Sequence, residues 1–427
     1  MSPLWLLAIF LVLIFLNTPI AIALGFAAMV GYTAMFGYDS LLTMAISLYQ
    51  GARSFPLIAI PLFVLAGAIM NTSGISQRLI AFVSALVGFV RGGLAMVNIG
   101  TSLFFAEISG SAVADVAALG SILIPSMKKR GYPTNFTAAI TSSSASLAII
   151  IPPSIPMILY GAMTDTSIVQ LFVAGVVPGL IGAFLMFLLA YGFAVRYNFP
   201  VEETFNLRRV GKTFKEAAWA LTVPVIILGG IFGGIFTATE AAGMAVAVAL
   251  FIGFFIYREM NLRMLIGAMT DGVIQTAVVM LLVAVSAFLG LYLTQTRVPQ
   301  QLTVFMLSLS ENPLIILAML NVLFLVIGMF LHGAAAIVLV VPIVMPIALA
   351  IGMNPVQFGI IVTLNLAIGQ QTPPVASVLM TACSIAKANV WDVSKVNIWF
   401  IGVLFLLLTL VTYVPYVSLA LVEAFYG

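Results

Sequence analysis

Charged side chains are scarce in this sequence. Asp, Glu, Lys and Arg make up 7% of its 427 residues, whereas soluble domains carry about 25%. The net charge is only +3 and the basic residues lie between apolar stretches, so we predict contact with membrane lipid and no nucleic acid partner. Hydrophobic residues reach 63%, in runs long enough for helices that cross a bilayer. The composition predicts an all-α polytopic membrane protein.

Cysteine and histidine each occur once. Cys383 alone cannot form an internal disulfide, and with His332 as the single histidine the chain cannot build a zinc site. A nucleophile paired with a base is also missing, and Gly211-Lys212-Thr213 lacks the earlier glycine of a phosphate-binding loop. The sequence therefore predicts that the protein is neither an enzyme nor an ATPase and has no organic cofactor.

Most apolar runs can span the bilayer as single helices, which takes roughly 20 residues. The runs 94–126 and 314–350 are instead broken into halves of about 16 to 18 residues, so we expect two re-entrant helical hairpins. Residues 75–91 and 297–310 are expected to lie as arms in the membrane interface, with a tilted span as the alternative for 75–91. The expected spans are 4–32, 55–71, 134–162, 168–195, 216–236, 238–257, 263–293, 355–385 and 397–424.

The same order of helix breaks occurs twice. Ser109-Gly110-Ser111 is followed by Pro152-Pro153, and His332-Gly333 is followed by Pro373-Pro374, with offsets of 223 at Gly333 and 221 at Pro373. Two prolines remove two backbone donors and cannot continue a helix, although simple kinks satisfied by nearby Ser and Thr are an alternative. Matching interruptions in two halves indicate an inverted-repeat transporter with one site near the membrane midplane.

Lys and Arg predict the orientation because they concentrate in cytoplasmic loops. The strongest clusters lie at 128–130, 196–215, 258–263 and 387–395. Counting crossings puts all four clusters on the cytoplasmic side, the N-terminus in the cytoplasm and the C-terminus in the periplasm. The two hairpins then enter the membrane from opposite faces.

This pattern divides the chain into a scaffold and a transport domain. The expected parts are, in chain order, scaffold helices with an interfacial arm (1–93), a first transport-domain repeat (94–195, with hairpin 94–126 and broken helix 134–162), scaffold helices with a second arm (196–310), a second repeat (314–395, with hairpin 314–350 and broken helix 355–385) and a C-terminal helix (396–427).

The hairpin breaks are the first candidates for a binding site. A break at Ser109-Gly110-Ser111 frees hydroxyl and carbonyl oxygens that suit a bare alkali cation, and Gly328 with His332-Gly333 offers a matching break. His332 could carry a proton, although a lone histidine at a break is more often structural. Asp115 lies four residues after Ser111 on the same helix face, where it either serves the site or supports the hairpin tip.

Polar residues in the broken helices are expected to lie opposite the tips. No Lys or Arg falls inside a hairpin or beside a Pro-Pro pair, so an anionic substrate would depend on helix dipoles, hydroxyls, amides and bound cations. This motivates the hypothesis of obligatory Na⁺ coupling. The candidate substrate-binding residues are Ser109, Ser111, Asp115, Ser143, Ser144, Pro152, Asn365, Gln371, Thr372 and Pro373, and the candidate Na⁺ ligands are Ser109, Gly110, Ser111, Gly328, His332, Gly333, Gly369 and Thr372.

Several segments together resemble the large membrane subunit of the tripartite ATP-independent periplasmic (TRAP) transporters, over nearly the whole chain. They are SGSAVAD at 109–115, IPSMKKRGYP at 124–133, IPPSIPM at 151–157, GIFTATEAA at 234–242 and NLAIG at 365–369. The resemblance implies an elevator-type, Na⁺-coupled importer of organic acids in the bacterial inner membrane. It also implies two partners, a small four-helix membrane subunit and a periplasmic substrate-binding protein.

The resemblance extends to the site and the substrate. Both hairpin tips, together with Asn365, Gly369, Thr372 and Pro373, match the family's cation and substrate region. Gln370-Gln371 and the segment 375–377 look more like the sialic-acid branch than the C4-dicarboxylate branch, so sialic acid is the expected substrate. The alternatives are a C4-dicarboxylate TRAP permease and a stand-alone Na⁺-coupled dicarboxylate or citrate carrier that needs no binding protein.

Overall fold

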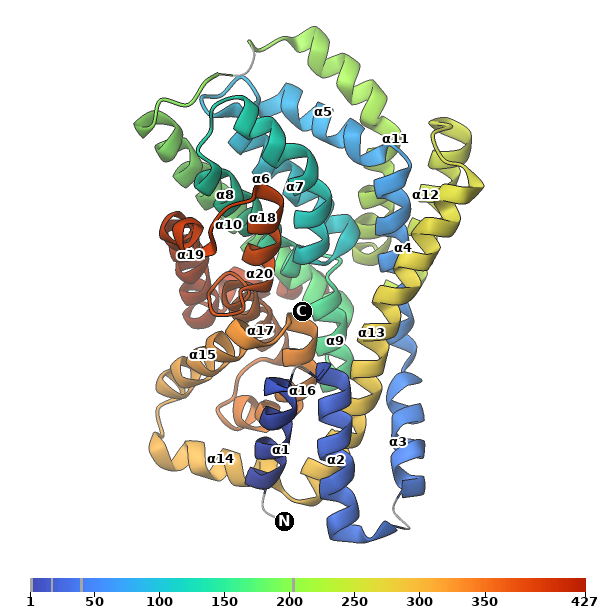
Figure 1. Cartoon of the computed structure of the whole chain (residues 1–427), viewed down its shortest axis with the longest axis vertical. Coiled ribbons are helices and arrows are strands. Elements are labelled where there is room, and N and C mark those ends of the chain that lie inside the picture. Colours follow the sequence, from blue (N-terminus) through green and yellow to red (C-terminus); the bar gives the residue numbers. More distant parts are fainter. Residues whose placement is uncertain (1–2, 17, 39–40, 202–203) are drawn as a thin grey trace.

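The computed structural model describes residues 3–16, 18–38, 41–201 and 204–427, without the side chains of residues 3, 4, 7, 11, 15, 108 and 109. Within these ranges every regular element is a helix (Figure 1). Eight of the described helices are long and apolar enough to cross a membrane. The all-α polytopic architecture predicted from composition is confirmed.

One group of helices packs around α13, and we call it the scaffold group, or scaffold for short. The long helix α13 packs against α2, α3 and α4, while α12 packs against α4 and α11. Thr237 and Glu240 form the capping box that starts α12. The bounds are α1 Pro3–Phe15, α2 Ile20–Phe36, α3 Leu41–Ala52, α4 Ala59–Thr72, preceded by the 3₁₀ turn Phe55–Ile58, α11 Leu207–Phe232, α12 Ala238–Phe251, followed by the π turn Ile252–Ile256, and α13 Leu262–Gln295.

Two apolar stretches expected as single helices are divided. The run 4–32 contains both α1 and α2, because Pro19 precedes α2 and has no N–H to continue a helix from α1. The C-terminal run separates at Val414 and Pro415 into α19 (Val390–Tyr413) and α20 (Tyr416–Tyr426). In Figure 1, α1 leads away from the N-terminal end of the molecule and α2 leads back towards it, whereas a single helix over 4–32 would have ended far from its start.

Both predicted hairpins are present. The first joins α6 (Gly93–Ser109) to α7 (Ala112–Lys129), and the second joins α15 (Pro313–Phe330) to α16 (Gly333–Ala350). Gly110 takes a φ of 57°, a left-handed conformation that favours glycine, at the end of α6. Leu331 and His332 are extended at the second tip. Each tip therefore exposes backbone groups between two helices of 17 or 18 residues.

Both broken helices are also present. The first consists of α8 (Thr134–Ala145), a 3₁₀ turn (Ser146–Ile149) and α9 (Ile155–Thr164), and the second of α17 (Pro355–Gly369) and α18 (Ser377–Ala386). Each repeat then continues into a long helix, α10 (Ile168–Arg196) or α19. The N-caps of these long helices, Ser167 and Asn389, occupy equivalent positions in the two repeats, which extends the repeat beyond the Pro-Pro pairs.

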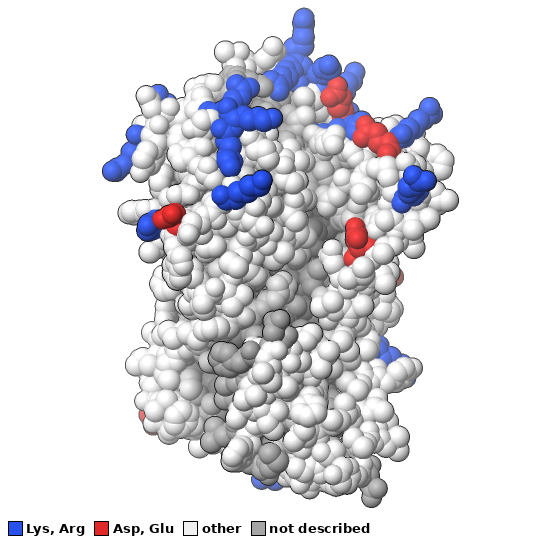
Figure 2. Space-filling model, in the orientation of Figure 1, with Lys and Arg blue, Asp and Glu red and all other residues white. Residues whose placement is uncertain are grey.

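Two shorter helices lie at opposite ends of the molecule. Helix α5 (Ile75–Val87) lies at the upper end in Figure 1, whereas α14 (Val298–Leu309) and the N-terminus lie at the lower end. Most Lys and Arg side chains in view gather towards the upper end (Figure 2). Arg78 of α5 forms an ion pair with Glu259 at 2.7 Å and lies 3.8 Å from the centre of the Tyr257 ring, which attaches α5 to the loop after α12.

Candidate substrate and cation site

A cavity of about 760 Å³ lies between the scaffold and the two hairpin tips. Its scaffold side consists of residues from α2, α4 and α13. Its other side includes Gly110 and Ser111 from the first tip, His332 and Gly333 from the second, and Gln370 from the second helix break. The structure thus brings both predicted tips to one cavity, although they belong to opposite halves of the sequence.

The first tip packs against the break of its own repeat. The amide of Ile155 donates to the Gly110 carbonyl oxygen at 3.4 Å. A Cβ atom at Gly110 would lie 2.8 Å from the carbonyl oxygen of Pro153, so a larger residue has no room there. The end of α6 at Gly110 therefore lies against the backbone of the break at residues 153–155.

The second tip makes a closer contact of the same kind. A Cβ atom at Gly369 would lie 2.5 Å from the Cα and carbonyl carbon of Gly328, which shows that α15 and α17 touch backbone to backbone. The amide of Val375 donates to the Met329 carbonyl oxygen at 3.3 Å. Thr372, which follows the end of α17, donates its hydroxyl to the Ile368 carbonyl oxygen of that helix at 3.0 Å.

The helix ends give the site a pattern of partial charge. Helices α7, α9 and α16 begin beside the cavity, and their N-terminal residues Ala112, Ile155 and Gly333 line it. Helix N-termini carry partial positive charge and bind anions. Helices α6, α15 and α17 end at the breaks, and helix C-termini with free carbonyls suit cations. The arrangement can hold an anion in the cavity and cations at the breaks.

Oxygen atoms are the available ligands for a cation. Among the described residues, no three His, Cys, Asp or Glu side chains lie close enough together to hold a metal. A cation at Gly110 or at the Gly328–Gly369 contact would therefore be bound by backbone carbonyls and hydroxyls. Such hard oxygen donors suit alkali ions better than transition metals.

Gln371 belongs to a buried network that joins the two repeats. Its side-chain amide donates to the Ser142 carbonyl oxygen at 2.7 Å and to the Ser146 hydroxyl. Asn397 of α19 donates to the Gln371 side-chain oxygen at 3.2 Å and accepts from Ser143 at 2.7 Å. Neither Gln371 nor Ser143 lines the cavity, so both lie behind the surface that a substrate would touch.

A second pair of matched networks holds each hairpin to its broken helix. In the first repeat Ser144 donates to Asn98 of α6 at 3.1 Å. In the second, Asn365 donates to Asn321 of α15 at 2.7 Å, and Asn321 is the counterpart of Asn98 at the offset that relates the two tip glycines. The Oδ1 atom of Asn365 is buried and has no hydrogen-bond partner in the described part of the chain.

The remaining candidate residues differ in exposure. Asp115 is completely buried and does not line the cavity, and Pro152 is also buried. Thr372 and Pro373 are partly exposed but lie outside the cavity wall. The side chain of Ser109 lies outside the described part of the structure, and only its place at the end of α6 is given.

The long helices α10 and α19 each contact the helix break of their own repeat. The contact is made at equivalent positions in the two helices but by different residues. Gly175 of α10 and Asn397 of α19 are equivalent, because each lies the same distance along the chain after the N-cap of its helix. A Cβ atom at Gly175 would collide with the Ile150 carbonyl oxygen. Asn397 instead donates to the Gln371 carbonyl oxygen at 3.4 Å. The repeats therefore share a backbone plan but differ in how each break is held.

Three polar residues of the cavity wall escaped the sequence reasoning. Gln370 was passed over in favour of Gln371, and its side chain donates to the Leu366 carbonyl oxygen at 3.2 Å. Asn71 of α4 and Gln275 of α13 come from the scaffold, where no repeated motif directs attention to them. The one available signal was a carboxamide in the apolar span at Gln275.

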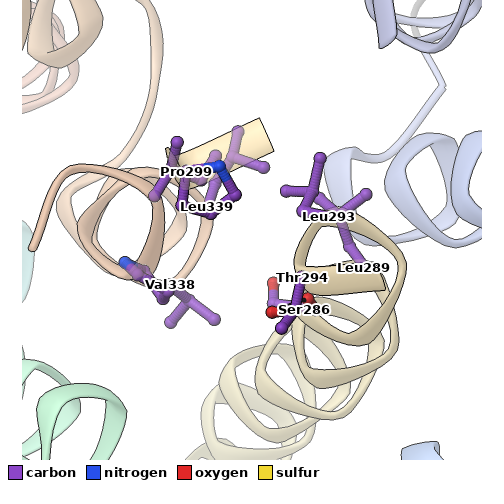
Figure 3. Close-up of a pocket in the computed structure, with 10 residues that line it drawn as sticks. Ser286, Leu289, Leu293, Thr294, Pro299, Val338 and Leu339 are labelled. Atoms are coloured by element: carbon purple, nitrogen blue, oxygen red, sulfur yellow. Dashed lines mark hydrogen bonds between the residues drawn. The ribbon is translucent and has the colours of Figure 1, made fainter. Parts of the chain in front are cut away.

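A separate small cavity of about 80 Å³ lies between α13, α14 and α16 (Figure 3). Leu289 and Leu293 face Val338 and Leu339 across it. The buried hydroxyl of Ser286 has no hydrogen-bond partner in the described ranges. This cavity contains none of the predicted site residues.

Comparison with known proteins identifies the family. The family model for the "Tripartite ATP-independent periplasmic transporter, DctM component" matches residues 7–417. The chain belongs to this family. It is a TRAP transporter large permease, a multi-pass membrane protein and not an enzyme, as the sequence predicted.

Relatives of this permease carry different substrate names. It is 39% identical to the "Isethionate TRAP transporter permease protein DctMQ" of Oleidesulfovibrio alaskensis, over 96% of this chain but only 64% of that protein's length. It is 37% identical to a "C4-dicarboxylate TRAP transporter large permease protein DctM" of Vibrio cholerae, over 94% of this chain and 93% of that one. It is 35% identical to the "Sialic acid TRAP transporter large permease protein SiaM" of the same species, over 88% of both.

A solved structure shares the fold of the permease. The Alcanivorax borkumensis YdaH transporter matches 90% of this chain and 90% of its own, with a TM-score of 0.63. The sequences are 14% identical, so the similarity concerns the fold alone.

Proposed function

We propose that this permease imports an organic anion together with Na⁺. The observation that carries the proposal is the cavity of about 760 Å³ beside which α7, α9 and α16 begin. None of the described wall residues is Lys or Arg, so positive charge for an anion would come from helix N-termini and from co-bound cations. A cation bound at either break would increase the affinity for the anion, which is the energetic basis of symport.

The proposed movement is an elevator. The hairpins and broken helices would carry the cavity past the scaffold, while α5 and α14 link the two parts at opposite ends. The proposed partners are the small four-helix membrane subunit and a periplasmic substrate-binding protein, in the bacterial inner membrane.

The orientation follows from the distribution of basic residues. The end rich in Lys and Arg in Figure 2 would face the cytoplasm. The N-terminus lies at the other end and would then be periplasmic, which revises the cytoplasmic placement expected from sequence. The division of 4–32 into α1 and α2 accounts for the revision. The periplasmic placement expected for the C-terminus is kept as part of the proposal.

Sialic acid is the substrate favoured by the Gln370-Gln371 pair. Relatives named for isethionate, C4-dicarboxylates and sialic acid have similar identities to this chain, between 35% and 39%. The shared feature of these cargoes is a carboxylate or sulfonate, which matches the helix N-termini at the cavity. Family membership disfavours the stand-alone carrier, because this permease would depend on a binding protein for delivery.

Reconstitution tests the proposal. The permease and its small subunit are placed in proteoliposomes, and uptake of N-acetylneuraminate, succinate and isethionate is measured with the binding protein outside. We expect uptake of one cargo that stops when external Na⁺ is replaced by K⁺. Undiminished uptake in K⁺ would refute cation coupling, and uptake without the binding protein would favour the stand-alone carrier.

A further inference from the structure

The scaffold side of the cavity contains two carboxamides in an otherwise apolar surface. We call the cavity-lining residues of α2, α4 and α13 the scaffold wall. Asn71 and Gln275 are its polar members, and all its other residues are apolar. An amide in an apolar membrane environment costs free energy unless it finds a hydrogen-bond partner. The presence of an amide side chain at Asn71 and Gln275 therefore needs a physical explanation.

Gln275 lies well inside α13, the longest described helix. Its side chain is exposed and lies between the wall residues Ile274 and Val278. Within the described residues its carboxamide forms no hydrogen bond. Its N–H and C=O groups are available to whatever occupies the cavity.

Asn71 lies at the end of α4 that leads to α5. Its Oδ1 atom accepts a hydrogen bond from the Ser76 hydroxyl of α5 at 3.0 Å. This contact fixes the carboxamide so that the oxygen faces Ser76 and the NH₂ group remains as a donor. An N–H donor in a cavity wall suits an anion better than a cation.

We propose that Asn71 and Gln275 are scaffold-side contacts for the anionic cargo and help to determine which anion is transported. This inference rests on the proposed function and adds the fixed part of the molecule to the recognition site. The residues of the hairpin tips would travel with the cargo, whereas the two carboxamides contact it only while the cavity lies against the scaffold wall. They act on one half of the transport cycle by donating N–H groups to carboxylate or sulfonate oxygens.

Cysteine protection tests the contact without requiring transport. Gln275→Cys is made in a Cys383→Ser background, which has no other cysteine, and its alkylation by a maleimide is followed in Na⁺ with N-acetylneuraminate, succinate or isethionate. We expect one of these anions to slow the reaction at least about tenfold. Thr276→Cys is the matched control, because the neighbouring residue does not line the cavity and should react at an unchanged rate. Equal rates with and without an anion that the complex binds in calorimetry would overturn the inference.

Transport kinetics test whether the two carboxamides act in only one half of the transport cycle. Gln275→Leu and Asn71→Ala should lower the maximal uptake rate about tenfold, since each removes a hydrogen bond to a charged ligand. Asn71 lies where α4 leads to α5, at the end of the molecule proposed to face the cytoplasm, so the proposed contacts follow pick-up and the apparent KM for cargo delivered by the binding protein should stay unchanged. Gln275→Asn, which keeps the carboxamide, should restore part of the rate.

Matched controls separate this result from a folding defect. Thr276→Val and Thr72→Val alter neighbouring residues outside the cavity wall and should transport like the wild type. The Thr72 hydroxyl bonds only to carbonyls of its own helix, at 3.0 and 3.1 Å. Normal kinetics in both carboxamide variants, with Na⁺-dependent uptake intact in the wild type, would overturn this inference and leave the proposed function standing. Absence of uptake in the wild type would instead refute the proposed function.

Discussion

Replacing Gly369 by alanine tests the backbone contact between α15 and α17 at the second hairpin. The added Cβ would lie 2.5 Å from the Cα and carbonyl carbon of Gly328. Carbon atoms in favourable contact are about 3.5–4.0 Å apart, so the helices must separate by about 1 Å. Overpacking of this kind costs about 1–3 kcal/mol, and the upper end applies because both colliding atoms belong to backbone.

If the proposed Na⁺ site lies at this contact, the strain should weaken Na⁺ binding as well as the fold. If about 2 kcal/mol falls on the cation-bound state, the affinity for Na⁺ decreases roughly 30-fold. The assay is the Na⁺ concentration that gives half-maximal uptake, together with thermal unfolding in detergent at increasing Na⁺. We expect Gly369→Ala to need far more Na⁺ for both uptake and stabilisation.

Gly402→Ala in α19 is the matched control. A Cβ there meets no heavy atom within 4 Å, and alanine is favoured over glycine inside a helix by up to about 1 kcal/mol. This variant should be at least as stable as the wild type and keep its Na⁺ dependence. Wild-type Na⁺ dependence and thermal stability in Gly369→Ala would refute the reasoning about the second break.

Three further predictions concern other parts of the molecule. Gln371→Leu should lower the free energy of unfolding by about 3 kcal/mol in denaturation experiments. It removes the donor to the buried Ser142 carbonyl and Ser146 hydroxyl oxygens and the acceptor for Asn397. An unchanged unfolding midpoint would exclude a structural role for Gln371. The hydrogen bond from Arg78 holds the pKa of the Glu259 carboxyl below its ordinary value of 4.5, so this ion pair stabilises the folded state above that pH and is lost as the pH falls through the lowered pKa. Glu259→Gln should therefore melt with less acid dependence than the wild type, by at most about 1 kcal/mol for so exposed a pair, and identical pH profiles would contradict this. A cysteine at Lys212, whose side chain is 77% exposed, should react with an impermeant maleimide only from the cytoplasmic side, and labelling from the periplasm would reverse the proposed orientation.

The helix breaks were predictable because their causes are local. Consecutive prolines at 152–153 and 373–374 and glycine at Gly110 interrupt a helix wherever they occur. Their repetition at a nearly constant offset then gave the two hairpins and the two broken helices. The same local chemistry was underestimated at Pro19 and Pro415, where the apolar run outweighed the proline and two helices were expected as one.

The sequence could not predict which polar side chains line the cavity and which are buried behind it. Gln370 lines the cavity and Gln371 lies in the buried network, yet the two residues are adjacent and chemically identical. Their separation depends on how α17 unwinds at its end, which is a tertiary property. Asn71 and Gln275 lie outside the repeats, so a search guided by internal symmetry passes over them.

The matched positions Gly175 and Asn397 constrain how the two halves can change. At Gly175 any side chain would collide with a carbonyl, whereas shortening Asn397 would leave a hole and a carbonyl without its donor. Substitution of Gly175 is opposed by steric crowding, and substitution of Asn397 is opposed by the loss of its hydrogen bond to the Gln371 carbonyl oxygen. Exchanging only these two residues, as Gly175→Asn with Asn397→Gly, should therefore destabilise both junctions, because each residue fits the break of its own half.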